Sequence, residues 1–233
     1  MTKKVLSGKE LRELSRSHND VQQLRISIGN RNRQGIGIKG KEKLEDLEND
    51  LKKQMEEILE LEELYVDFLE NIRGCGPGLS AAIIGELTSK TTIKQCAECK
   101  KKDNSKTFCN NCERIYNERT VNDFPSSAHL WAYTGYGLKN GEILKRKKGQ
   151  KANWNQFLKM TLWKWAQNQI KQGRTYRKIY DERKKYEQAQ NKERKSKLTD
   201  GHIHNRTTRY MIKKFLSHLW YFWKGEFEGE LPK

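Results

Sequence analysis

The sequence contains no apolar run that approaches the roughly 18 residues needed to span a membrane, and its first residues do not have the pattern of a secretory signal peptide. Only 34% of the 233 residues are hydrophobic, whereas 33% are charged. The hydrophobic core must therefore be modest, and the composition favours an extended, helix-rich body over a large globule. Six Trp residues argue against wholesale disorder. We expect a mainly α-helical protein that is cytoplasmic, nucleoid-associated and without a membrane partner.

The charge is strongly positive and unevenly distributed. A formal net charge of +17 and a pI near 9.6 favour a polyanionic partner. From Lys41 to Glu70 there are four Lys against twelve Asp and Glu, a net of −8. From Lys139 to Tyr186 there are fifteen Lys and Arg against three acidic residues, a net of +12. The first segment suits a strut and the second a binding surface, for which DNA is the expected partner and structured RNA the alternative.

Four cysteines form two Cys-x2-Cys pairs in the middle of the chain: Cys96, Cys99, Cys109 and Cys112. Two such knuckles supply the four thiolates that structural Zn²⁺ prefers, and nine mostly polar residues separate them. A disulfide framework is the alternative, but cytosolic thiols stay reduced. A closed four-thiolate shell leaves no position for a substrate. The spacing therefore predicts one structural Zn²⁺ in a small ribbon or knuckle module, residues 95–115.

The acidic segment has a seven-residue periodicity. The apolar positions are Leu44, Leu51, Ile58, Tyr65 and Ile72, with Leu47, Leu61 and Phe68 in the alternate seam and Gln54 as its polar member. Four heptads predict a coiled-coil helix. A weaker seam predicts a helix from about Gly8 to Ile28, and Gly29–Gly35 has the composition of a turn. We expect a helical coiled-coil arm over residues 1–70, as an antiparallel hairpin or as a dimer.

The segment 71–94 has the pattern of a helix-hairpin-helix element. Gly74 and Gly76 can adopt positive φ and let a partner approach the backbone. Pro77 suits the first turn of a second helix, whose N-terminal N–H groups would face a DNA phosphate. A tight turn that binds nothing is the alternative. Cys75 is interpreted as a small buried hydrophobic residue rather than a ligand or a nucleophile.

Residues 116–233 are predicted to form a basic helical domain. We expect a short helix Ala128–Tyr133 capped by Ser126 or Ser127, a helix Asn155–Lys171, a charged helix or tether Arg174–Lys197, and a last helix Arg206–Trp223. His202 and His204 are interpreted as loop or capping residues. The basic loop Lys145–Trp154 interleaves cations with Asn, Gln and Trp. It could neutralise phosphates and stack a base or a sugar, or be a solvated loop.

Together these arguments predict a set of nucleic-acid contacts from the hairpin, the basic loop and the last helix. The set is Arg73, Gly74, Gly76, Gly78, Lys145, Arg146, Lys147, Lys148, Lys151, Trp154, Arg206, Arg209 and Lys213.

Four blocks, in this order, carry a resemblance to a known family. They are Ile72–Pro77 with Ala81-Ala82, Phe124-x4-His129-Leu130-Trp131-Ala132-Tyr133-Thr134-Gly135, Gly149-Gln150, and Arg206-x2-Arg209-x3-Lys213. Over roughly residues 65–223 the chain resembles the C-terminal, helix-hairpin-helix-type transposase domain of DEDD-type insertion-sequence transposases, recombinases that use a bridge RNA. The four-Cys module looks like an insertion between the hairpin and the helix Ala128–Tyr133.

The chain departs from that family's pattern in both halves of the active site. Complete members carry an N-terminal RuvC-like nuclease domain, whereas a net basic segment of about forty residues precedes the acidic helix here. The family's catalytic serine lies in the loop after the helix that ends at Gly135, but Tyr136–Glu142 contains no serine. The resemblance implies the nucleic-acid-handling part of a transposase, active in DNA transposition and recombination, with a homo-oligomer or a companion nuclease as possible protein partners. The alternatives are an RNA-binding ribonucleoprotein scaffold, or a recombinase whose nucleophile is Tyr136, Tyr133 or Ser127.

Overall fold

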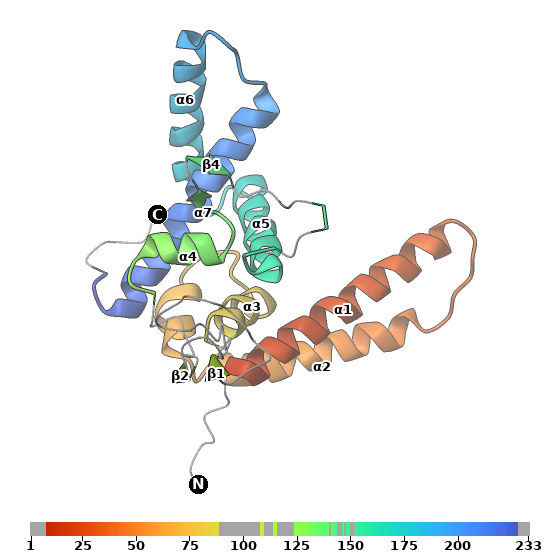
Figure 1. Ribbon diagram of the computed structural model, residues 1–233. Helices are drawn as coiled ribbons and strands as arrows, with labels where there is room; N and C mark the ends of the chain where they lie inside the picture. Colours follow the sequence, from red (N-terminus) through yellow and green to blue (C-terminus); the bar gives the residue numbers. More distant parts are fainter. Residues whose placement is uncertain are drawn as a thin grey trace. The chain divides into compact units, whose positions relative to one another are not determined.

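A computed structural model describes residues 8–88, 108–109, 114–115, 124–139, 141–143, 146, 148–149 and 152–227; for 108–109, 114–115 and 139 it describes the backbone alone. The described chain is mainly α-helical, as predicted (Figure 1). It divides into two compact units. The first takes the chain up to Val66 and from Gly76 to Asp123, and the second takes Asp67–Cys75 and the chain from Phe124 onward.

In the first unit, α1 (Gly8–Arg33) and α2 (Lys41–Leu59) lie side by side as an antiparallel hairpin (Figure 1). The turn lies later than predicted, because Gly29 to Arg33 continue the helix and residues 34–40 connect the two helices. Asn32 closes this connection. Its amide nitrogen donates to the Ile38 carbonyl at 2.9 Å, and its side-chain oxygen accepts from the Ile38 N–H at 2.7 Å.

The predicted coiled-coil seam is only half right. Ile58 is buried, but Leu47 and Leu61 are 45% and 49% exposed. Met55 is fully buried, and Glu48 bonds Arg25 of α1 at 2.6 Å. The alternate seam is therefore shifted by one residue to Glu48 and Met55, because steps of four and three residues give the same average period in either order. The helix also ends at Leu59, and a π-helical segment, η1 (Leu64–Leu69), follows, so four continuous heptads do not form.

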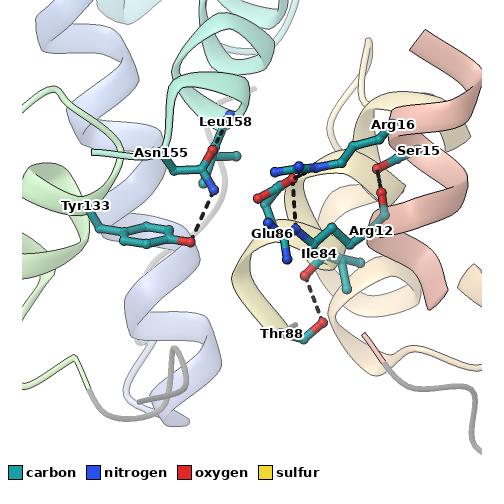
Figure 2. Close-up of polar contacts among 9 residues, drawn as sticks. All are labelled: Arg12, Ser15, Arg16, Ile84, Glu86, Thr88, Tyr133, Asn155 and Leu158. Atoms are coloured by element: carbon teal, nitrogen blue, oxygen red, sulfur yellow. Dashed lines mark hydrogen bonds and ion pairs between the residues drawn. The ribbon is translucent and has the colours of Figure 1, made fainter. Parts of the chain in front are cut away.

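The third helix, α3 (Pro77–Thr88), is the core of the first unit: every residue from Ser80 to Leu87 is buried. It packs closely on α1, since a Cβ on Gly85 would lie 2.5 Å from the Arg12 backbone nitrogen. The Glu86 carboxylate, with no exposed side-chain surface, accepts from Arg12 at 3.3 Å and Arg16 at 2.6 Å (Figure 2). The two guanidinium groups compensate the cost of burying this carboxylate. Without them, an unpaired buried charge would strongly destabilise the fold.

Two short strands, β1 (Phe108–Cys109) and β2 (Arg114–Ile115), pair antiparallel with Phe108 opposite Ile115 and Cys109 opposite Arg114. This ladder lies within the predicted zinc module and brings the chain back on itself after Cys109.

The second unit consists of α4 (Ser127–Tyr133), α5 (Gln156–Lys171), α6 (Arg177–Glu193) and α7 (Asp200–Lys224), with Asp67–Cys75. Its core is aromatic. The Phe215 ring lies 4.2 Å from the Trp165 ring, 5.6 Å from the Tyr176 ring and 6.3 Å from the Phe68 ring. Cys75 is buried here, as predicted.

The boundaries of α5 agree with the prediction, while α7 begins six residues earlier than predicted. Thr199 caps α7, its hydroxyl accepting from the His202 N–H at 3.3 Å. His202 and His204 are therefore helical rather than loop residues. A hairpin that the sequence analysis missed, β3 (Leu138–Lys139) with β4 (Glu142–Ile143), follows Gly135. None of the helices in the described part of the chain has the length and apolar character that a membrane crossing needs.

Candidate nucleic-acid interface

Asn155 fixes the start of α5 against the end of α4. Its side-chain oxygen accepts from the Leu158 N–H at 2.9 Å, the N-cap bond of α5. Its amide nitrogen donates to the Tyr133 hydroxyl at 3.1 Å (Figure 2). Its backbone N–H donates to the Tyr133 carbonyl at 2.8 Å. This residue therefore positions the segment before α5, including Trp154, relative to α4.

A groove of about 1370 Å³ opens in the second unit beside this junction. Four structural elements contribute to its lining: the β3–β4 hairpin, one face of α5, the middle of α6 and one face of α7. Its charged and aromatic lining residues include Tyr136, Arg146, Trp154, Lys159, Trp163, Arg183, Glu187, Arg206, Arg209, Tyr210 and Lys213. Six of them are cationic, and the carboxylates in the lining are Glu142 and Glu187.

Five of the predicted contacts line this groove, although they come from distant parts of the sequence. They are Arg146, Trp154, Arg206, Arg209 and Lys213. Lys148 is exposed outside the lining. Lys145, Lys147 and Lys151 lie outside the described residues. The basic loop and the last helix, predicted separately, thus contribute to one surface.

Glu187 neutralises part of the groove. Its side chain is 2% exposed and accepts from Arg183 of its own helix and from Arg206 of α7 at 2.8 Å. Burial raises the pKa of Glu187, but the hydrogen bonds from Arg206 and Arg183 outweigh burial and hold the pKa below its usual range. The Arg183 guanidinium also lies 4.6 Å from the Tyr210 ring centre. Arg206, predicted as a nucleic-acid contact, therefore has an intramolecular carboxylate partner.

Three other cations in the groove have no carboxylate partner among the described residues: Lys159, Arg209 and Lys213. Burial lowers the pKa of Lys159 and of Lys213, and the charge of Arg209 lowers both further. Burial also lowers the pKa of Arg209. Rings lie beneath the two ammonium groups, with Lys159 Nζ 4.7 Å from the Trp154 ring centre and Lys213 Nζ 4.7 Å from that of Trp131. Arg209 is close enough to each lysine to repel it.

Trp154 belongs to the wall of the groove. A Cβ on Gly135 would lie 2.6 Å from Trp154 Cδ1, and Gly135 has φ 76°, so only glycine fits beneath the ring. The Lys159 ammonium group also lies against this indole, so residues of the same unit contact the ring.

The glycines of the predicted helix-hairpin-helix differ from expectation. Gly74 has φ 99°, but Gly76 does not adopt positive φ. A Cβ on Gly74 would lie 2.9 Å from Gln169 Nε2 of α5, so the close approach that this glycine permits is made by the protein itself. Gly78 lies against His18 of its own unit. Gly74 and Gly76 belong to different units, and Arg73 is exposed.

Tyr136, the alternative nucleophile in the loop after Gly135, already uses its hydroxyl in a hydrogen bond. It donates to the Lys159 carbonyl at 2.9 Å, and the side chain is buried. Burial raises the pKa of Tyr136 well above its ordinary value. A phenol that stays protonated and already donates a hydrogen bond is a poor nucleophile.

Ser126 precedes α4 as predicted, but its hydroxyl makes no capping bond. It lies 2.9 Å from His129 Nδ1 instead, in an exposed pair. Of the zinc candidates, Cys109 is placed by its backbone in β1, whereas Cys96, Cys99 and Cys112 lie outside the described residues. Burial raises the pKa of the Cys75 thiol to about 12, which suits a core residue and not a thiolate ligand.

Sequence reasoning missed the contributions of α5 and α6 to the groove. Gln156, Lys159, Met160 and Trp163 are spaced three, one and three residues apart, which places them on one face of α5, opposite its buried residues. The hairpin also had a signal, because Asn140-Gly141 is a favoured two-residue turn and Gly141 has φ 77°.

Comparison of the chain with protein-family models, with curated proteins and with solved structures gives no match.

Proposed function

We propose that this chain is a DNA-binding protein of the transposase type that takes part in DNA transposition, as a nucleic-acid-handling part without its own nuclease centre. The groove of the second unit carries the proposal. It collects six cations around a hollow of about 1370 Å³, and its lining includes five residues that the sequence analysis had selected as nucleic-acid contacts.

The physical basis is neutralisation of phosphates by Lys and Arg. Each contact releases condensed counterions, so affinity falls linearly with salt on logarithmic axes. Glu187 partly compensates Arg183 and Arg206, whereas Lys159, Arg209 and Lys213 remain uncompensated by any ion pair in the described chain. The net charge of +17 would add a long-range attraction.

The family assignment and the metal rest on the sequence. The ordered glycine, Leu-Trp-Ala-Tyr and Arg-x2-Arg-x3-Lys blocks support the transposase proposal. The four cysteines of the two Cys-x2-Cys pairs support a structural Zn²⁺. This ion would stabilise the module of residues 95–115 and supply no catalytic chemistry.

The test measures duplex DNA binding against salt for the parent and for a variant in which Lys145, Arg146, Lys147 and Lys148 are all replaced by Ala. The matched control replaces Lys41, Lys43, Lys52 and Lys53 of α2, which removes the same charge from the other unit. We expect the loop variant to bind every duplex more weakly and with a shallower salt slope, and the α2 variant to bind like the parent. Affinity that barely changes between low and physiological salt would contradict the proposal. Nucleic acid recovered with the purified protein, digested by ribonuclease alone, would instead favour the RNA-scaffold alternative.

A further inference from the structure

The groove has two chemically different parts. The cationic part contains Lys159, Arg209 and Lys213. The other part is apolar and open to solvent: Leu138 is 54% exposed, Ile143 41%, Met160 39% and Trp163 37%. The first two come from the β3–β4 hairpin and the last two from α5. An exposed apolar surface beside a cationic cluster calls for a ligand that has both an anionic and an apolar side.

In the described part of the chain, no carboxylate pairs with the three cations of the cationic part. Arg209 Nη1 is buried and has no hydrogen-bond partner among the described residues. Leaving a buried charged donor unsatisfied is costly, and two lysines add to the cost by repulsion. Burial and the charge of Arg209 lower the pKa of Lys159 and of Lys213, because both disfavour the charged form of each lysine. A phosphate contacting these three side chains would satisfy the guanidinium and relieve the repulsion.

The apolar part discriminates between forms of nucleic acid. Paired duplex DNA presents phosphates and sugars to a groove while its base faces stay stacked inside, so it offers little to Trp163 and Met160. An unpaired base presents a flat face that stacks on aromatic side chains. The volume of about 1370 Å³ exceeds the ~300–1,000 Å³ of ordinary small-molecule pockets. It therefore suits a short stretch of strand better than a single small ligand.

We propose that this groove holds an unpaired stretch of a DNA strand, with a backbone phosphate on Arg209, Lys159 and Lys213 and a base against Trp163 and Met160. The inference rests on the proposed DNA-binding function and specifies its substrate: DNA that is locally opened rather than fully paired.

The experiment compares two fluorescein-labelled DNA duplexes with identical ends, one fully paired and one with a central unpaired bubble, by fluorescence anisotropy on the full chain. We expect the parent to bind the bubble about tenfold more tightly, the scale of one base stacked on an aromatic ring. Trp163→Ala should abolish this preference by weakening binding to the bubble, with a much smaller effect on the paired duplex. Trp163→Phe should retain the preference, and Tyr221→Ala, at an exposed tyrosine outside the groove, should behave as the parent.

Arg209→Gln tests the phosphate part. It should weaken binding to both probes and lower the salt slope for the bubble by about one, whereas Lys171→Gln, the same charge change outside the groove lining, should not. Equal affinity of the parent for both duplexes, or a preference that survives Trp163→Ala, would overturn the inference while leaving DNA binding intact. Absence of binding to either duplex at low salt would overturn the proposed function as well.

Discussion

Gln169 of α5 donates a hydrogen bond from Nε2 to the Arg73 carbonyl at 2.7 Å and thereby ties the glycine-rich segment to the core of the second unit. The other end of the same amide accepts from the Tyr176 N–H at 3.1 Å, so one fully buried side chain fixes two backbone segments. The residue after Arg73 is Gly74, and a Cβ there would lie 2.9 Å from Gln169 Nε2.

Gly74→Ala should therefore destabilise the protein. The added Cβ would be strained by the positive φ and would press on the Gln169 side-chain amide, which is held by its two hydrogen bonds. We expect a loss of roughly 2 kcal/mol in the free energy of unfolding, measured with urea. Gly76→Ala is the matched control, since it has ordinary φ and nothing lies within 4 Å of its added Cβ. If the Gly76 variant lost as much stability as the Gly74 variant, the packing account would be wrong.

The ion pairs of Glu187 predict a stability that depends on pH. The hydrogen bonds from Arg206 and Arg183 hold its pKa below the unfolded value. The stabilisation is thus complete above the unfolded pKa of about 4.3 and disappears as the pH falls through the folded pKa. Glu187→Gln should lower the free energy of unfolding by about 2 kcal/mol near neutral pH, and the difference from the parent should shrink as Glu187 of the parent becomes protonated.

Urea unfolding at neutral and at acid pH checks this expectation. Asp181→Asn is the control, because the Arg177–Asp181 pair lies on the same helix but is exposed and should contribute little. A Glu187 variant whose deficit is the same at both pH values would show that the carboxylate acts through shape rather than charge.

The zinc prediction is tested by metal analysis. We expect one Zn²⁺ per chain, lost in a Cys96→Ser, Cys99→Ser double variant but retained in Cys75→Ala, whose thiol is buried in the second unit. Loss of the metal should weaken DNA binding and leave the helical signal of α1 and α2 intact. Less than about half an equivalent of Zn²⁺ in the parent, together with fully reactive thiols, would exclude the site.

Helices were predicted best from the sequence where burial of one face gives the apolar residues a regular spacing. The boundaries of α5 follow from its apolar spacing and from Asn155 as N-cap. The seam of α2 could not be chosen in the same way, because Leu47 and Glu48 fit a seven-residue repeat equally well and Arg25 of α1 decides between them. A carboxylate at a partly buried seam position is unfavourable unless a cation pairs with it, and the sequence does not show that Arg25 does so.

The groove was predictable only in parts. Arg146 and Trp154 were selected from the basic loop, and Arg209 and Lys213 from the last helix, but more than fifty residues separate the two pairs. No spacing rule joins residues so far apart, because tertiary packing brings them together. Arg183 and Glu187 were predicted only as part of a charged helix or tether, since the contact of Glu187 with Arg206 of α7 has no signature in the sequence.

Tyr136→Phe tests whether the loop after Gly135 carries chemistry. The hydroxyl is buried, donates to the Lys159 carbonyl, and has a raised pKa, so it lacks the activation that a nucleophile needs. Removing it should cost about 1 kcal/mol of stability through the lost hydrogen bond and should leave DNA binding unchanged. Metal-assisted phosphodiester chemistry needs several converging carboxylates, but the carboxylates of the groove lining are Glu142 and Glu187, and Glu187 is paired with Arg183 and Arg206. We therefore also expect the parent not to cut or join supercoiled DNA with Mg²⁺ present. A covalent protein–DNA adduct formed by the parent and absent from the Tyr136→Phe variant would make this chain an active recombinase and replace the DNA-handling proposal.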